Sequence, residues 1–354
     1  MTAPLVSVCV PTCDRVDFLR ESLLSITAQT YEPLEILISD NASTDATEAV
    51  CRELAARDPR VRYIRHARNI GLYQNHNLCI DESRGEYLGF LHDDDLHSPS
   101  LIAENAAVLT AHPSVGIVCA DWDLIDDAGA CFATRRFAVG TVTPGLDYIE
   151  RTLATGRSSI CCPGTLIRRS ALGEIRFPET GPIGFGDFLL WFEIAERADV
   201  GHVGKPLWSY RQHARSLSRR TIESLTEDYI VNLEAYFVGH LRRWPGETRR
   251  ITRWRRLAAR YAFWALIYEI CLHARRERGV STPGSSPTIF EQANYHLSAA
   301  EVVRVRATLR RLRHGVVEDF VLFVMERLLD AGLTAPLAWA TRHTERVRAL
   351  LVAR

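Results

Sequence analysis

The first 120 residues alternate between short apolar runs and amphipathic stretches. Apolar runs rich in β-branched or aromatic residues predict buried strands at residues 6–10, 34–38, 61–64, 87–91 and 115–120. Apolar positions at helical spacing predict helices at residues 17–29, 46–57, 74–83 and 99–112. Strands that alternate with helices in this way build a mainly parallel sheet flanked by helices. The pattern therefore predicts a Rossmann-like α/β fold.

The pattern of apolar and polar residues changes toward the second half of the chain. Residues 121–165 are less regular, residues 187–197 have a helical pattern, and residues 200–210 predict a strand pair or an extended segment. Long amphipathic helices are expected at residues 222–242, 252–276, 298–314 and 316–331, with a linker rich in Gly, Ser and Pro at residues 279–287. We therefore expect two domains, an α/β domain at residues 1–220 and a helical region at residues 221–354.

The charge distribution supports this division. The 354 residues carry no formal net charge, which gives no reason to expect a nucleic-acid partner. Residues 1–220, however, hold 22 Arg and Lys against 29 Asp and Glu, whereas residues 221–354 hold 21 against 14. An acidic first part and a basic second part suggest different partners for the two regions.

Two interpretations of the basic region stay open. It interleaves arginines with tryptophans: Arg242, Arg243, Trp244, Arg249, Arg250, Arg253, Trp254, Arg255 and Arg256. A basic stretch beside an apolar helix is able to lie on an anionic membrane surface, which suits a lipid-linked acceptor. The simpler interpretation is a helical appendage packed on the first domain, with its arginines in solvent or in ion pairs. Apolar helices in this region would also allow a homodimer.

The cysteines and the apolar runs indicate a cytoplasmic protein. Nine cysteines are scattered along the chain, without the spacing of a zinc site. The first ten residues lack the basic start of a signal peptide. No run of about 18 uncharged apolar residues predicts a membrane span. Reduced thiols in the cytoplasm fit best, at the inner face of the membrane if the basic region binds lipid.

The strongest chemical signal is Asp93-Asp94-Asp95, directly after the expected strand 87–91. Withdrawing ionised carboxylates from water costs several kcal/mol or more each unless they are paired. Their hard oxygen atoms suit Mg²⁺ or Mn²⁺. In an open α/β sheet, ligands bind beyond the carboxyl ends of the strands. The triplet therefore predicts a divalent cation that holds a phosphate-bearing substrate, and the alternative is a solvated acidic turn.

Further polar segments are expected at the same edge of the sheet. Pro11-Thr12-Cys13-Asp14-Arg15 follows the first strand, and the segment 39–45 follows the second. Both should face the crevice of the acidic triplet because they end neighbouring parallel strands. Arg68-Asn69-Ile70-Gly71 precedes the helix expected at residues 74–83.

These motifs, in this order, resemble glycosyltransferase family 2, an inverting family with the GT-A fold. The matching residues are Gln29, Glu35-Ile36, Asp40-Asn41, Ser43, Asp45, Asn69-Ile70-Gly71 and Asp93-Asp94-Asp95. The segment 184–191 resembles the catalytic-base segment of that family, and Tyr210-Arg211-Gln212-His213 resembles the segment that closes its catalytic domain. The resemblance covers roughly residues 5–218 and does not extend to residues 221–354.

The resemblance implies a metal-dependent transfer of a sugar from a nucleotide-sugar donor, with a UDP-sugar expected first. The acceptor would be a hydroxyl of a glycan, a lipid-linked molecule or a small molecule. Mn²⁺ or Mg²⁺ would be held by Asp94, Asp95 and His213. The nucleotide-sugar pocket would be formed by Pro11, Thr12, Asp14, Asp40, Asn69, Asp93 and Asp94. Asp187 would be the general base, ionised at neutral pH if its pKa is the ordinary ~3.9.

Two departures from the family pattern stand beside this reading. His92 and Gly186 occupy positions where many relatives carry Asp and Glu, respectively. Simpler roles also stay open, with Asp40 and Asp187 as caps, His213 as a surface histidine, and Thr12 and Asn69 as turn residues. The alternative function is a non-catalytic nucleotide-sugar binding or scaffold protein of a glycan pathway.

Overall fold

The computed structural model describes residues 3–179, 186–213, 216, 222–258 and 261. The chain divides into two compact units, the first formed by Met1–Ile149 with Ser158–Ala214 and the second by Glu150–Arg157 with Arg215–Arg354. The helices predicted at residues 298–314 and 316–331 and the linker at residues 279–287 lie outside the described residues.

The first unit is built on one ten-stranded sheet. Its strands are β1 (Val6–Thr12), β2 (Leu34–Asp40), β3 (Val61–Arg65), β4 (Tyr87–Phe90), β5 (Leu96–His97), β6 (Val115–Ile125), β7 (Cys131–Arg135), β8 (Val142–Thr143), β9 (Thr165–Arg168) and β10 (Asp199–Arg211). The spatial order is β3-β2-β1-β4-β9-β6-β10-β5, while β7 pairs with β6 and β8 with β10. The first four strands in this order are parallel, and β9 runs antiparallel to both β4 and β6.

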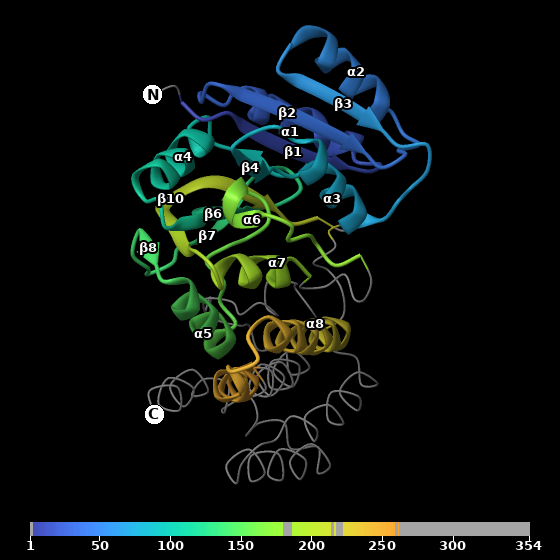
Figure 1. The fold of residues 1–354 in the computed structure, drawn as a ribbon. Helices are drawn as coiled ribbons and strands as arrows, with labels where there is room; N and C mark the ends of the chain where they lie inside the picture. Colours follow the sequence, from blue (N-terminus) through green and yellow to red (C-terminus); the bar gives the residue numbers. More distant parts are fainter. Residues whose placement is uncertain (1–2, 180–185, 214–215, 217–221, 259–260, 262–354) are drawn as a thin grey trace, which may run out of the picture. The chain divides into compact units, whose positions relative to one another are not determined.

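Helices pack on both faces of this sheet (Figure 1). The described helices of this unit are α1 (Val16–Thr27), α2 (Thr47–Arg57), α3 (Leu72–Glu82), α4 (Leu101–Ala111), α6 (Arg169–Leu172) and α7 (Gly186–Ala195). Helix α5 (Gly145–Thr155) continues into the second unit, to which α8 (Ile222–Arg243) belongs. In the sheet, β1 and β2 are buried along their whole length, as expected for parallel strands covered by helices. The predicted α/β class is confirmed.

Two local predictions need correction, and one pair of alternatives is decided. Residues 121–165 are not irregular, because β6 continues to Ile125 and is followed by β7, β8 and α5. At residues 200–210 the extended segment is confirmed, because residues 199–211 form one strand, whose register against β6 shifts around Pro206. Pro11 does not end β1 but pairs with Ser39, beyond the point where β4 stops pairing with β1 at Cys9. A proline is tolerated there because it needs no ladder hydrogen bond on that side.

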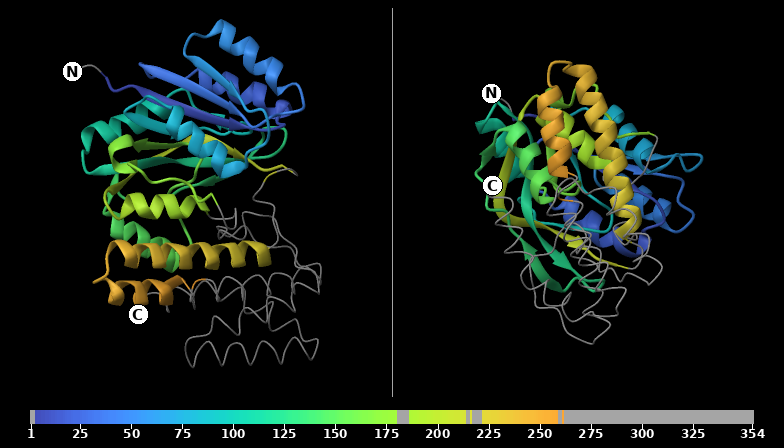
Figure 2. Two further views of the ribbon diagram at one scale, coloured as in Figure 1. Left: turned by 45° about the vertical axis from the view of Figure 1, so that its right-hand side comes forward. Right: turned by 90° about the horizontal axis from the view of Figure 1, so that it is seen from below.

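In the second unit, α8 runs beside a helical segment at residues 248–258 (Figure 2). The segment therefore starts four residues earlier than the predicted helix 252–276. The rings of Tyr236 and Trp254 stack at 6.1 Å, and the Arg255 guanidinium lies 2.8 Å from Glu234. Arg253 pairs with Glu150 at 2.8 Å, also within this unit. Among the described residues, no helix has the length and apolar character needed to cross a membrane.

Candidate functional site

The expected site forms where β1, β2 and β4 end. Thr12, the last residue of β1, pairs with Asp40, the last residue of β2, so the loops after both strands start at the same edge of the sheet. The chain leaves β4 at Phe90 and enters the acidic triplet three residues later. The structure therefore brings the three predicted segments together at one edge, as the rule for parallel sheets requires.

The acidic triplet is buried rather than a solvated turn. Asp93 is 7% exposed and Asp95 is 1% exposed, whereas the side chain of Asp94 is 16% exposed. Asp95 Oδ1 accepts a hydrogen bond from the backbone N–H of Arg211 at 2.8 Å, and Arg211 Nε donates to the Asp94 carbonyl at 2.9 Å. The end of β10 therefore holds the triplet in place, and Arg211 is itself anchored by Glu21 at 2.7 Å.

Asp94 lies against the predicted histidine. His213 Nε2 is 3.0 Å from Asp94 Oδ2, and His213 is 3% exposed, so it is not a plain surface histidine. The ring of Phe18 packs on the imidazole with 4.6 Å between ring centroids. Arg15 Nη1 lies 3.4 Å from His213 Nε2 and 4.0 Å from Asp94 Oδ2. The arginine at the start of α1 thus faces the most exposed carboxylate of the triplet.

The three carboxylates differ in how readily they ionise. Burial and the neighbouring charge of Asp94 raise the pKa of Asp93 to about 7. The same two causes raise the pKa of Asp95 well above its ordinary value. Burial also acts to raise the pKa of Asp94, but the hydrogen bond with His213 and the nearby positive groups outweigh it, so this pKa lies below its usual value. A bound divalent cation would favour the ionised form of all three.

The donor set fits such a cation. His92, Asp94 and Asp95 each offer one ligand atom, and these atoms lie within 4.8 Å of one another. Two buried atoms of this group, Asp95 Oδ2 and His92 Nε2, have no hydrogen-bond partner among the described residues. A cation would supply the missing partner, with carboxylate oxygens suited to Mg²⁺ or Mn²⁺. The sequence prediction missed His92 as a possible ligand because its position carries an acid in the family pattern.

Asp40 and Thr12 line the neighbouring part of the edge. Asp40 is fully buried, with Oδ1 accepting from the Ser43 N–H at 2.8 Å and Oδ2 from the Tyr63 hydroxyl at 2.6 Å. It therefore caps the turn after β2, which was the open alternative for this residue. Asp40 Oδ2 also lies 3.7 Å from Arg65 Nε. A hydrogen bond from Asp40 to a nucleotide base stays a prediction.

Asn69 and Asp14 shape the loops around this edge. Asn69 Oδ1 accepts hydrogen bonds from Asn41 Nδ2 at 3.0 Å and from the Gly71 N–H at 2.9 Å. Asp14 has a positive φ of 51°, and its carboxylate accepts the backbone N–H of Thr44 at 2.6 Å. Both side chains thus tie the loop after β2 to its neighbours. A direct nucleotide contact by Asn69, Asp14 or Pro11 stays a prediction.

Asp187 lies in the first turn of α7, where its Oδ1 accepts the Phe188 N–H at 3.1 Å. It is partly buried, and burial raises its pKa to about 6, which corrects the expectation of an ordinary value. Its charge acts on the Cys162 thiol, as does that of Asp95, so both carboxylates lie in electrostatic reach of one side chain. The structure therefore places Asp187 at a helix start, and its role as general base stays a prediction.

The packing of Tyr73 accounts for the glycine beside Asp187. A Cβ atom at Gly186 would lie 2.6 Å from the Tyr73 ring, which real contacts do not permit. Tyr73 stacks on Phe177 at 5.3 Å, which fixes the ring in this place. The glutamate of the family pattern is therefore excluded at position 186 by the packing of this chain.

Comparisons with known proteins agree with the geometry. Residues 7–176 match the profile of the family described as Glycosyl transferase family 2. An uncharacterized glycosyltransferase of Haemophilus influenzae is 35% identical over 222 residues, which are 61% of this chain and 68% of that protein. The O-antigen biosynthesis protein RfbC of Myxococcus xanthus is 29% identical over 224 residues, or 61% of this chain. The chain spans only 16% of RfbC, and 22% of the 37% identical uncharacterized protein y4gI of Sinorhizobium fredii.

The fold has close neighbours among solved structures. Residues 1–349 of S. aureus TarS, in a crystal structure with UDP-GlcNAc, align with a TM-score of 0.59 and 15% identity, covering 96% of this chain and 91% of that one. The same protein with UDP aligns with a TM-score of 0.58 and 17% identity, covering 98% and 89%. These alignments confirm the predicted GT-A type of α/β fold.

Proposed function

The chain belongs to glycosyltransferase family 2, and we propose that it transfers a sugar from a nucleotide-sugar donor to an acceptor hydroxyl, with inversion at the anomeric carbon. The observation that carries the proposal is the contact of Asp94 with His213 at 3.0 Å, made at the edge where β1, β2 and β4 end. Two residues 119 positions apart meet there beside two further buried carboxylates. Such an arrangement suits the binding of a cation and a diphosphate better than it suits stability, since buried carboxylates cost folding free energy.

A divalent cation, Mn²⁺ or Mg²⁺, is part of the proposal. Asp94, Asp95 and His213 would hold it. When bound, the cation would offset the negative charge that develops on the diphosphate leaving group. Asp93 and Thr12 would face the donor from the ends of β4 and β1, and Arg15 would add positive charge on the side of α1.

The donor is proposed to be a UDP-sugar. TarS, which shares the fold, has been crystallised with UDP and with UDP-GlcNAc, and this makes the uridine nucleotides the first donors to test. Asp40 would contact the nucleotide from the end of β2, and Asn69 from the loop after β3. Both side chains are held in place by the hydrogen bonds described above, so their remaining lone pairs and N–H groups point in fixed directions.

Asp187 is proposed as the general base. It would accept the proton of the acceptor hydroxyl while the hydroxyl oxygen forms its bond to the anomeric carbon and the bond from that carbon to the diphosphate oxygen breaks. With a pKa of about 6, the carboxylate is mostly ionised at pH 7 and is a stronger base than an ordinary aspartate. The acceptor is proposed to be a glycan, a lipid-linked molecule or a small molecule. Residues 221–354 are proposed to form a separate region for acceptor, membrane-surface or oligomer contacts.

Calorimetric titration tests the donor site. UDP, dTDP and GDP would each be titrated with and without Mn²⁺ into wild type and into Asp94→Ala. Binding of one nucleotide that needs both the metal and Asp94 would support the proposal and identify the donor class. Binding that is independent of both, or no binding at all, would contradict the metal site.

The Asp187→Asn variant separates catalysis from binding. An enzyme should lose sugar transfer while it keeps donor affinity, because the base acts on the acceptor. Unchanged function of Asp187→Asn in cells would instead favour the non-catalytic scaffold. Asp81→Asn, which alters a carboxylate 59% exposed to solvent, is the matched control.

A further inference from the structure

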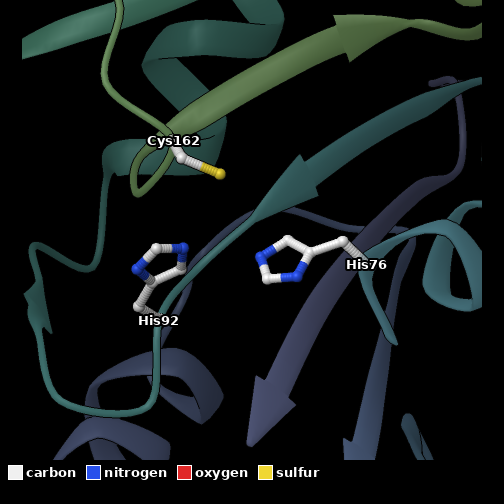
Figure 3. Close-up of side chains that lie close together, drawn as sticks. All are labelled: His76, His92 and Cys162. Carbon is white, nitrogen blue, oxygen red and sulfur yellow. The ribbon is translucent and has the colours of Figure 1, made fainter. Parts of the chain in front are cut away.

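A second group of metal-ligating side chains lies beside the acidic triplet. His76 on α3, His92 after β4 and Cys162 before β9 each offer one ligand atom, and the three atoms lie within 4.8 Å of one another. Figure 3 shows the two imidazoles and the thiol pointing into a common space. The three residues are far apart in the sequence, so the fold alone brings them together.

We propose that His76, His92 and Cys162 form a binding site for Zn²⁺, separate in ligand chemistry from the acidic site. Two imidazole nitrogens and a thiolate sulfur are the donors that Zn²⁺ prefers, whereas Mg²⁺ and Mn²⁺ prefer the oxygens of the triplet. Three protein ligands leave the fourth position of a tetrahedral ion to water or another small molecule. This inference does not rest on the proposed sugar transfer.

The surroundings prepare His76 for this role. Its Nδ1 lies 2.9 Å from the Leu72 carbonyl, and because a carbonyl only accepts, the N–H must be on Nδ1 and the lone pair on Nε2. Histidine ligands commonly fix their second nitrogen in this way. The ring is further held by Phe90 and Phe177, whose centroids each lie 5.2 Å from it. Burial lowers the pKa of His76 to about 3, so the imidazole stays neutral.

His92 and Cys162 supply unused donor atoms. His92 Nε2 is buried and has no hydrogen-bond partner among the described residues. Cys162 is 8% exposed and lies near the end of the loop that leads into β9. Burial raises the pKa of the Cys162 thiol well above its usual value, so it is a thiol until a metal displaces the proton. Binding of Zn²⁺ would form the Zn–S bond and release that proton to solvent.

The required movement is small. Zn–N bonds of about 2.0 Å and Zn–S bonds of about 2.3 Å place neighbouring ligands of a tetrahedral ion about 3.3–3.7 Å apart. The three atoms lie within 4.8 Å before any ion is bound, so a shift of about 1 Å closes the site. Since the His76 ring is held in place, His92 and Cys162 would make this movement by rotation about their side-chain torsions.

Co²⁺ is the probe that reports directly on the sulfur ligand. Reduced wild-type protein titrated with CoCl₂ is expected to bind one ion with thiolate-to-cobalt charge-transfer absorption and tetrahedral d–d bands, and one equivalent of ZnCl₂ should abolish both. Cys162→Ser and His76→Gln should each lose the charge-transfer band or lower its affinity at least tenfold. Cys161→Ser, the adjacent cysteine, should keep it. Asp94→Ala should also keep it, because the acidic site contains no sulfur.

No charge-transfer absorption in wild type, or an undiminished band in Cys162→Ser, would overturn the proposal. Crystals of wild type grown with ZnCl₂ give a second test that needs no variant. An anomalous peak at the zinc edge between His76, His92 and Cys162 is expected, and a peak only at the acidic triplet would refute the assignment.

Discussion

Replacing Asp187 with Asn should make the protein more stable while it removes the proposed base. The carboxyl of Asp187 is partly buried, and its pKa is about 6 instead of the ordinary 3.8. A raised pKa means that the folded protein disfavours the charged form, so at neutral pH the ionised side chain costs stability. Asparagine has nearly the same shape without the charge, and it can accept the same hydrogen bond from the Phe188 N–H.

The size of this effect follows from the pKa. A rise from 3.8 to about 6 corresponds to a cost of at most about 3 kcal/mol at pH 7. Asp187 keeps part of its surface in water, which screens its charge, so we expect Asp187→Asn to gain about 1–2 kcal/mol. In wild type the folded state binds the proton more tightly than the unfolded state. The contribution of Asp187 to stability therefore falls as pH rises from about 4 to about 6 and is level above that.

Urea unfolding of both proteins at pH 4.5 and pH 7 tests this reasoning. The advantage of Asp187→Asn should be small at pH 4.5, where Asp187 is protonated in the folded protein, and should reach its full size at pH 7. The control is Asp81→Asn, which removes an exposed carboxylate paired with Arg176 at 2.8 Å and should change stability by less than about 1 kcal/mol. A loss of stability in Asp187→Asn, or an advantage equal at both pH values, would refute the proposed cost of the buried charge.

Three further predictions address the base, the glycine and the arginine of the site. With donor and metal saturating, kcat should rise about tenfold between pH 5 and pH 7 as Asp187 loses its proton, and a flat pH–rate profile would contradict its role as base. Gly186→Ala should cost about 1–3 kcal/mol in urea unfolding, because its Cβ would lie 2.6 Å from Tyr73, whereas Gly204→Ala, with no atom within 4 Å, should be tolerated. Arg211→Met should lower the free energy of unfolding by about 2–4 kcal/mol, since it removes the side-chain hydrogen bonds that anchor the triplet. It should also weaken metal-dependent nucleotide binding in calorimetry. An unchanged unfolding midpoint would contradict this role.

The sequence predicted the first half of the fold well because local patterns decide it. Residues 34–38 are apolar except for Glu35, and they appear as the core of β2, buried along its whole length. The same logic failed in residues 121–165. There β6 buries the polar residue Asp121 next to Trp122, and the hydrogen-bond partner of Asp121 lies on β10, far away in the sequence. Asp121 is satisfied by His202 at 2.9 Å, a contact that no local pattern announces.

The site was predicted at the level of segments, and the structure supplies the atoms. The end of a parallel strand is a position that sequence can locate, so Asp94 and Asp40 were expected at one edge. The hydrogen-bond partners of each carboxylate oxygen depend on the tertiary structure, so the sequence does not predict them. Asp40 serves Ser43 and Tyr63, whereas Asp95 has one oxygen on Arg211 and one without a partner among the described residues. His92 looked like a departure from a pattern, and it becomes a potential ligand only because the loop after β4 turns it toward other donors.

The buried arginine at the end of β10 explains how this chain tolerates three adjacent carboxylates. Arg211 is 2% exposed and reaches three separate elements, with hydrogen bonds to the Asp94 carbonyl, the Asp127 carbonyl and the Glu21 carboxylate. The guanidinium of Arg211 therefore forms its ion pair with Glu21, and its other hydrogen bonds go to backbone carbonyls. It forms no ion pair with Asp93 or Asp95 among the described contacts. The pKa values of both stay raised, because burial and the charge of Asp94 outweigh the groups that lower them. Two buried carboxylates with raised pKa values would lose their protons more readily if a divalent cation bound beside them, which is the reason to test metal binding here before any other property.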